Sequence, residues 1–272
     1  MLFFRKKYFT GMDIGTSSIK IVHFQAEKDP VFDYYVKNIR FSDREDPSMH
    51  QVQEVVGEIV AENKKLIDSV VVGIQGVTNF IRYIEIPKIS HKDLEVALRY
   101  EANKFVPFPI EEESITHKIL PTLTNDRNKM GVTFRAIPLG KLKRLDSLLQ
   151  EMNIKSRLIE PSPFALARAF KKTKLYNRGE IVMIVNIGTK YTNITICRDG
   201  GVYFSRDFLL AGRDFTNYLI SSEHHEYTDA EVFKRTTDLF AKEKTLLKIR
   251  PIIDEWLQEL LDSQDYFCLL YT

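Results

Sequence analysis

Residues 12–18 read MDIGTSS and residues 185–191 read VNIGTKY, so one chain carries nearly the same short phrase twice. Each phrase lies between two apolar segments with the composition of β-strands, and a third such segment follows. The order of strand, Ile-Gly-Thr turn, strand and strand is therefore repeated, which predicts two lobes of similar construction. The acidic residue of the first phrase, Asp13, returns as Asn186 in the second.

The composition is typical of a folded globular protein. The 272 residues are enough for one large domain or two lobes, and 44% of them are hydrophobic. The 39 basic and 37 acidic side chains leave a net charge of +2, which argues against nucleic acid as a partner. No apolar run approaches the roughly 20 residues that cross a bilayer, so we expect no direct membrane insertion. Only two cysteines occur, which favours a reducing cytoplasm.

The order of the segments predicts three parts. The first lobe spans residues 1–87 and is completed by residues 152–178, which follow an inserted subdomain at residues 88–151. The insertion begins after Pro87 and has the pattern helix, strand, strand, helix. Residues 179–272 form the second lobe, which starts with the second phrase and becomes helical toward its end.

Apolar periodicity predicts single elements within these parts. Residues 52–60 have the spacing of an amphipathic helix, and residues 69–76 form an apolar run typical of a strand covered on both faces. Ser90 is placed to cap the first helix of the insertion. Pro251 suits the first turn of the last helix. The buried stripe of that helix is expected to contain Ile252, Ile253, Trp256, Leu257, Leu260 and Leu261.

The two turns have the residues that a phosphate site needs. A glycine after a buried strand lets backbone N–H groups approach an anion without interference from a Cβ atom, and successive N–H groups form a nest for phosphate oxygens. Thr16 and Ser17 add hydroxyl donors, and Lys20 adds a positive charge. Asp13 is suited to hold Mg²⁺ through water. Two such turns that face each other would hold one polyphosphate from both sides, although neither matches a Walker A loop.

These features resemble the actin, Hsp70 and sugar-kinase ATPase superfamily. Residues 12–20 look like its first phosphate motif, residues 185–195 like its second, and residues 159–170 like the segment that connects its lobes. Within the superfamily, the chain is similar to the PilM family of type IV pilus assembly proteins, from about Phe9 to Phe267. The stretches that carry this similarity are residues 86–112, 158–170, 198–219 and 229–235. The resemblance implies an actin-like α/β fold with the inserted subdomain that PilM shares with the division protein FtsA.

The resemblance also implies a binding site for ATP and Mg²⁺. Residues of the first lobe that would contact phosphates or Mg²⁺ are Asp13, Gly15, Thr16, Ser17 and Lys20. Residues of the second lobe with the same role are Gly188, Thr189 and Thr192. Glu160 would face the water shell of the metal, and Gly212 would let the next helix approach the nucleotide. Glu231 and Lys234 fall where the family places its contacts to the base and the ribose.

The partner implied by the resemblance is a membrane protein. In PilM-like proteins, a cleft between the first subdomain and the inserted one receives the short cytoplasmic tail of PilN. We therefore expect a PilN-like partner, contacts to other pilus assembly proteins, and a cytoplasmic location at the inner face of the cytoplasmic membrane. Self-association stays open.

Two features depart from the family. Asn186 stands where the family usually has Asp, and an amide cannot act as a base. Either the site binds with little hydrolysis, as in a weak ATPase at most, or Asn186 is a tolerated isostere. Relatives also continue beyond the end of this chain with a glycine-rich turn and the last strands of the second lobe. We therefore expect an incomplete second lobe with an uncovered sheet edge and weakened binding of adenosine.

Three classes of function fit these residues. The first is a nucleotide-binding scaffold of the pilus inner-membrane platform. The second is a filament-forming protein like FtsA, which would gain support from an amphipathic anchor that this sequence lacks. The third is a small-molecule kinase, which needs a carboxylate base between the lobes, and no suitable motif supplies one. The scaffold is favoured.

Overall fold

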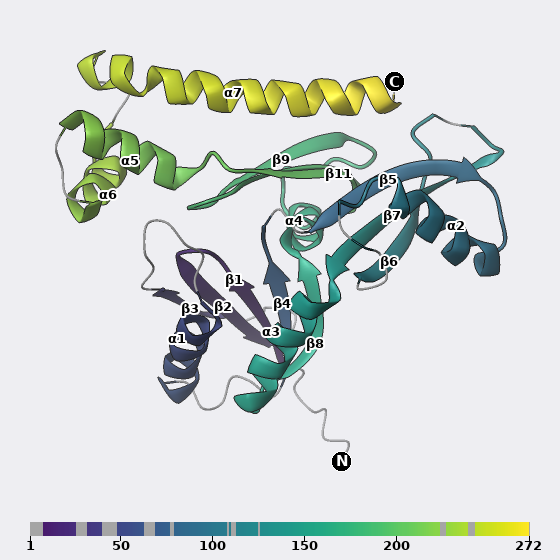
Figure 1. The fold of residues 1–272 in the computed structure, drawn as a ribbon, viewed down its shortest axis with the longest axis horizontal. Coiled ribbons are helices and arrows are strands. Elements are labelled where there is room, and N and C mark those ends of the chain that lie inside the picture. The colour runs from purple at the N-terminus through teal and green to yellow at the C-terminus, as the bar shows by residue number, and fades with distance from the viewer. Residues whose placement is uncertain are drawn as a thin grey trace.

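A computed structural model describes residues 8–25, 32–39, 48–62, 69–76, 79–107, 109, 113–124, 126–223, 227–238 and 243–271. Its strands form two sheets with helices on their faces (Figure 1). The first sheet has five strands, and the second has six.

The first sheet is the predicted core of the first lobe. Its strand order is β3 (Phe32–Asn38), β2 (Ser18–Gln25), β1 (Tyr8–Ile14), β4 (Ser69–Ile74) and β8 (Lys155–Pro161). Strands β1, β2 and β3 form an antiparallel meander, whereas β4 and β8 run parallel to β1. This arrangement brings the chain after the insertion back into the first sheet, where β8 pairs with β4.

Helices α1 (Met49–Glu62) and α3 (Leu139–Glu151) contribute to the core on one face of this sheet. Burial alternates along β4, so that Val70 and Val72 lie in the core while Val71 and Gly73 line a cavity on the other face. The expectation that this strand is covered on both faces was therefore wrong. Its open face belongs to the site.

The second sheet joins the insertion to the second lobe. Its strand order is β6 (Glu113–Leu120), β7 (Lys129–Pro138), β5 (Phe80–Pro87), β11 (Gly201–Phe208), β10 (Thr192–Arg198) and β9 (Ile181–Ile187). The junction between β5 and β11 rests on the single pair Phe204 and Arg82. Strand β5 pairs along its length with β7, so Phe80–Pro87 belongs with the insertion and not with the first lobe, where the boundary after Pro87 had placed it.

Two further helices pack against the strands of these sheets. Helix α2 (His91–Asn103) covers the insertion with Leu94, Leu98 and Ala102 buried, and Ser90 accepts a hydrogen bond from the Asp93 N–H as the predicted N-cap. Helix α4 (Ser162–Phe170) lies between the two sheets (Figure 1) and contacts strands of both.

The second lobe ends in three helices, α5 (Gly212–Glu223), α6 (Tyr227–Thr236) and α7 (Glu243–Tyr271). Helix α7 runs along the second sheet (Figure 1) and begins well before Pro251, which lies inside it. The proline is tolerated because Pro251 and Leu247, whose carbonyl loses its donor, are both exposed to water. Leu257 and Leu261 are 45% and 53% exposed, so the buried stripe is narrower than predicted.

Within the described part of the chain, no helix combines the length and the apolar character that a bilayer span requires. Strand β9 forms the outer edge of the second sheet, where Ile181 and Ile187 are exposed.

Candidate functional site

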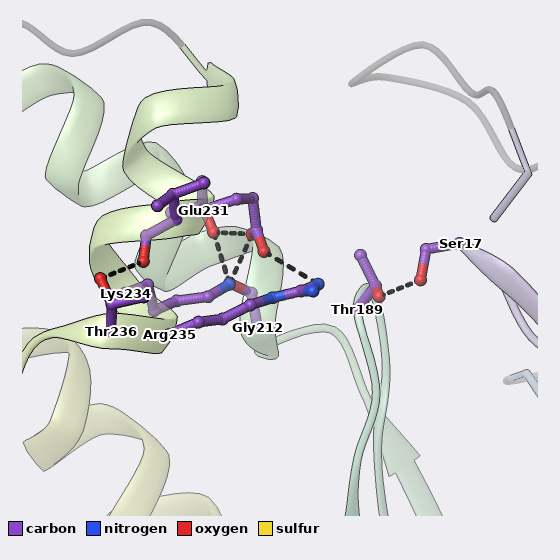
Figure 2. Close-up of polar contacts among 9 residues, drawn as sticks. Ser17, Thr189, Gly212, Glu231, Lys234, Arg235 and Thr236 are labelled. Atoms are coloured by element: carbon purple, nitrogen blue, oxygen red, sulfur yellow. Dashed lines mark hydrogen bonds and ion pairs between the residues drawn. The ribbon is translucent and has the colours of Figure 1, made fainter. Parts of the chain in front are cut away.

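The two Ile-Gly-Thr turns meet each other across the space between the lobes. The hydroxyl oxygens of Ser17 and Thr189 lie 2.5 Å apart. Figure 2 shows this contact between the two turns. Both turns are closed in the same way, because the Gly15 N–H donates to the Ser18 carbonyl and the Gly188 N–H donates to the Tyr191 carbonyl. The repeated phrase therefore codes for two equivalent hairpin turns that touch at their tips.

The start of α5 is tied to the second turn. The Gly212 N–H donates to the Gly188 carbonyl at 3.0 Å, and the Arg213 N–H donates to the Thr189 carbonyl at 2.8 Å. The N-terminus of a helix carries partial positive charge, which favours an anion nearby. The structure thus brings a helix N-terminus next to a nest-like turn.

Three glycines at these turns are required by close backbone contacts. A Cβ atom on Gly188 would lie 2.8 Å from the Tyr191 carbonyl oxygen, and one on Gly15 would lie 3.0 Å from the Ser18 carbonyl oxygen. A Cβ atom on Gly212 would lie 3.1 Å from the Gly188 carbonyl oxygen. Alanine at Gly188 would force these backbones apart, and alanine at Gly15 or Gly212 would require the facing backbone to shift by a few tenths of an ångström, so the glycines keep the turns and the start of α5 close together.

A cavity of about 740 Å³ lies beside these turns and is bounded by the open face of the first sheet, by α4, by the start of α5 and by the later part of α6. This size is within the range of small-molecule sites. The predicted site residues that line it are Asp13, Gly15, Thr16, Ser17, Lys20, Glu160, Asn186, Gly188, Thr189, Gly212, Glu231 and Lys234.

Thr192 is the predicted site residue that the cavity lining does not include. Its side chain is fully buried, and its hydroxyl donates to the Leu210 carbonyl at 2.7 Å and accepts from the Trp256 indole N–H at 3.2 Å. Thr192 therefore connects the second-lobe sheet to α7 behind the turn, and its hydroxyl is committed to protein groups.

Each carboxylate of the cavity lies beside a basic side chain. Asp13 is 2.9 Å from the Lys20 ammonium, and the Glu160 carboxylate is bonded to Arg168. The four basic residues of the lining, Lys20, Arg168, Lys234 and Arg235, face the three acidic residues Asp13, Glu160 and Glu231, so the formal charge is 4 − 3 = +1. The cavity is mildly positive and internally neutralised.

Glu231 and Lys234 form a polar knot at the far end of the cavity (Figure 2). The Lys234 ammonium donates to the Gly212 carbonyl at 2.8 Å, to the Thr216 hydroxyl at 2.6 Å and to Glu231 at 2.5 Å. These bonds use all three of its donors. Burial alone would raise the pKa of Glu231, but the hydrogen bonds from Lys234 and Thr216 outweigh it and lower that pKa. The knot fastens α6 to the start of α5.

Among the described residues, no three His, Cys, Asp or Glu side chains cluster to hold a metal ion by themselves. A divalent cation near Asp13 would need further oxygen ligands from water and from a bound phosphate. Asp13 could therefore contribute one carboxylate to a Mg²⁺ site whose other ligands come from water and a bound anion.

Comparison with known proteins identifies the family. The sequence profile of the family described as type IV pilus assembly protein PilM matches residues 11–269. The chain belongs to this family. The solved structure of a PilM–PilN type IV pilus biogenesis complex is similar with a TM-score of 0.82 and 22% identity, over 97% of this chain and 79% of that one.

Two further solved structures share the fold of this PilM-family chain. The ethanolamine utilization protein EutJ from Carboxydothermus hydrogenoformans is 16% identical with a TM-score of 0.55, over 94% of this chain and 71% of that one. MreB5 of Spiroplasma citri bound to AMPPNP is 12% identical with a TM-score of 0.54, over 96% of this chain and 79% of that one. The expected actin-like ATPase fold is confirmed.

Sequence reasoning missed several residues of the cavity in this PilM-family chain. Arg168, Gln75, Ser162 and Arg235 line it, and none was singled out. Arg168 follows Glu160 in the connecting segment, and its position on a short helix directly after the strand was a usable signal. Gln75 directly follows β4 beside the open face of the sheet, and no sequence motif marks this position.

A partly buried carboxylate near Asn186 was also missed. Asn186, Asn193 and Asp207 are cross-strand neighbours on β9, β10 and β11. The Asn193 amide donates to Asp207 at 2.8 Å, and burial raises the pKa of Asp207. Asp207 lines a small second cavity with Asn186 and Gln75, behind the main one. It does not line the main cavity itself.

A third cavity of about 450 Å³ lies between β5, β11 and α7. Phe80, Tyr83, Phe204 and Tyr266 contribute to its mainly apolar wall, and no glycine turn approaches it. Arg82 and Arg206 also line it, but it lacks the glycine turns that bring backbone N–H groups to a phosphate.

Proposed function

We propose that this PilM-family protein is a nucleotide-responsive scaffold of the type IV pilus inner-membrane platform. In this proposal ATP and Mg²⁺ bind between the lobes, and a neighbouring cleft holds the cytoplasmic tail of a PilN-like membrane protein. The observation that carries the nucleotide site is the contact of the two turns through Ser17 and Thr189 at the floor of one cavity.

The ion pair of Lys20 and Asp13 can be replaced by contacts of each side chain with a bound nucleotide and its Mg²⁺ ion. The Lys20 and Asp13 side chains are 48% and 32% exposed, so their ion pair contributes little to stability and is easily given up. Lys20 would donate to phosphate oxygens instead, and Asp13 would then accept from water bound to Mg²⁺. Bound Mg²⁺ would neutralise phosphate charge, and without it Asp13 would repel the phosphates. Binding should therefore depend on Mg²⁺.

The turns would supply the neutral donors through the hydroxyls of Thr16, Ser17 and Thr189 and through backbone N–H groups. The Gly212 and Arg213 N–H groups already donate to the second turn, so α5 would contribute the partial positive charge of its N-terminus. The close contacts of Gly188 and Gly212 keep these groups near one another. The Glu231 carboxylate is suited to accept hydrogen bonds from ribose hydroxyls while it also accepts one from Lys234.

Hydrolysis is expected to be weak or absent. Asn186 cannot accept a proton at neutral pH, and the cavity carboxylates Asp13, Glu160 and Glu231 already lie beside basic groups. The same pairing disfavours the small-molecule kinase, which needs a carboxylate that is available as a base. We infer a site that binds better than it cleaves.

The family match and the similarity to PilM in a PilM–PilN complex support the partner. A PilN-like tail would place the chain at the inner face of the cytoplasmic membrane. The insertion, formed by β5, β6, β7 and α2, would provide one wall of the peptide cleft, with the first lobe as the other wall.

Calorimetric titration of ATP with and without Mg²⁺ tests the nucleotide site. The wild type should bind only with Mg²⁺, and Asp13→Ala should lose most of that binding. Asp33→Ala is the matched control, because Asp33 is exposed on β3 of the same sheet and does not line the cavity. A folded wild type that does not bind ATP would overturn the nucleotide site. A PilN-like tail peptide, titrated separately, tests the scaffold role.

A further inference from the structure

Two arginines approach one buried carboxylate at the boundary between the cavity and the insertion. The Glu160 side chain, at the end of β8, is 4% exposed. Both terminal nitrogens of Arg168 on α4 donate to it, one of them at 3.2 Å. Arg135, on β7 of the insertion, lies 3.9 Å from the same carboxylate. Three parts of the chain therefore meet at Glu160.

The two arginines face different surroundings. The Arg168 side chain is 52% exposed and lines the nucleotide cavity. The Arg135 side chain is 19% exposed, donates to Thr116 on β6, and lies 5.4 Å from the centre of the Phe164 ring. One arginine is available to a ligand, and the other is embedded in the insertion.

The two arginines also lie at different distances from the Glu160 carboxylate. Arg168 is hydrogen-bonded to Glu160, whereas 3.9 Å is too long for a hydrogen bond from Arg135. Arg135 therefore has an interaction still to gain. A buried carboxylate without a cationic partner is strongly unfavourable, so Glu160 needs a second cation whenever Arg168 leaves.

A phosphate in the cavity would compete for Arg168, because a guanidinium group binds phosphate and carboxylate oxygens with the same two-pronged geometry. We propose that Arg168 turns to a phosphate of the bound nucleotide and releases Glu160, which Arg135 then holds more closely. The position of the insertion relative to α4 would thus depend on whether the cavity holds a nucleotide. This inference rests on the proposed nucleotide site and assigns a positioning role to Arg135 and Glu160.

The test is the affinity for Mg²⁺-ATP, measured by calorimetry on a double-mutant cycle. Arg168→Gln should weaken binding about tenfold or more, because a charge-assisted contact is lost. Arg135→Gln should weaken it about fivefold, although Arg135 does not line the cavity, because Glu160 then retains Arg168. In a Glu160→Gln background the effect of Arg135→Gln should disappear.

Controls separate this coupling from damage to the fold. Arg99→Gln removes an exposed arginine of α2 and should leave the affinity unchanged. Circular dichroism and Tm verify folding of each variant, and Arg168→Lys, which keeps the charge without the two-pronged geometry, serves if Arg168→Gln does not fold. The inference is overturned if the wild type binds ATP but Arg135→Gln does not change the affinity. It is also overturned if the effect of Arg135→Gln persists in the Glu160→Gln background. Wild type that does not bind overturns the proposed function instead.

Discussion

Replacement of Gly188 by alanine tests whether the second turn is held by steric necessity. The added Cβ atom would lie 2.8 Å from the Tyr191 carbonyl oxygen, below the 3.0 Å that real Cβ contacts respect. That oxygen accepts the Gly188 N–H at 2.9 Å, so the clash opens the hydrogen bond that closes the turn. Overpacking of this kind costs about 1–3 kcal/mol.

If the bound state requires the closed turn, the same cost appears as a loss of about 5- to 150-fold in the affinity for Mg²⁺-ATP. Unfolding should occur at a lower temperature as well, by about 2–4 °C for each kcal/mol. Calorimetric titration and thermal unfolding measure the two effects on one preparation. A Gly188→Ala variant with the affinity and the Tm of the wild type would refute the steric argument.

Gly57→Ala is the matched control for this variant. A Cβ atom there would lie 3.8 Å from the Met152 methyl carbon, which is an ordinary contact, and Gly57 lies inside α1. Alanine is the better helix former by about 1 kcal/mol, so this variant should bind nucleotide normally and unfold at a slightly higher temperature.

Three further changes test other parts of the account. Burial raises the pKa of Asp207 above its ordinary 3.8, so the charged carboxylate lowers the free energy of unfolding once pH exceeds the pKa of Asp207 in the folded protein. Asp207→Asn should therefore raise the free energy of unfolding at pH 7.5. In urea unfolding, this difference from the wild type should shrink as pH falls toward 3.8. Burial opposes the charge of Glu85, but hydrogen bonds from Thr124, Tyr83 and the Leu123 N–H lower its pKa below 4.5. Glu85→Gln should therefore lower the free energy of unfolding by about 1–2 kcal/mol at pH 7. The difference in stability between this variant and the wild type should close as pH falls below 4.5. Lys234→Met removes three hydrogen bonds of the knot and should lower the free energy of unfolding by about 2 kcal/mol; an unchanged urea midpoint would show that the knot is not a stabilising feature.

Local patterns in the sequence were sufficient for most of the elements and for the turns. The spacing of Val52, Val56 and Ile59 defines the buried face of α1, and Ser90 caps α2 as its side chain chemistry predicts. The two Ile-Gly-Thr sequences were correctly predicted to form equivalent turns, because in each of them a glycine directly follows an apolar strand, as a tight turn requires. Such features depend on neighbours along the chain.

Features that depend on distant residues were not predictable in the same way. The pairing of β5 with β11 through Arg82 and Phe204 joins parts of the chain that no periodicity connects. The contact of Arg168 with Glu160 depends on side-chain directions at a strand-to-helix junction. The start of α7 was placed too late because Pro251 favours a first helical turn, although the residues before it form helix equally well.

Hydrogen–deuterium exchange with and without saturating Mg²⁺-ATP tests the central claim most directly, because it reports on both turns in one experiment. The claim is that the turn at Gly15–Ser17 and the turn at Gly188–Lys190 hold one polyphosphate between them. The account predicts that the amides of both turns exchange more slowly with the nucleotide, and to a similar degree. Protection confined to one turn, or absent from both while the nucleotide is bound, would contradict it.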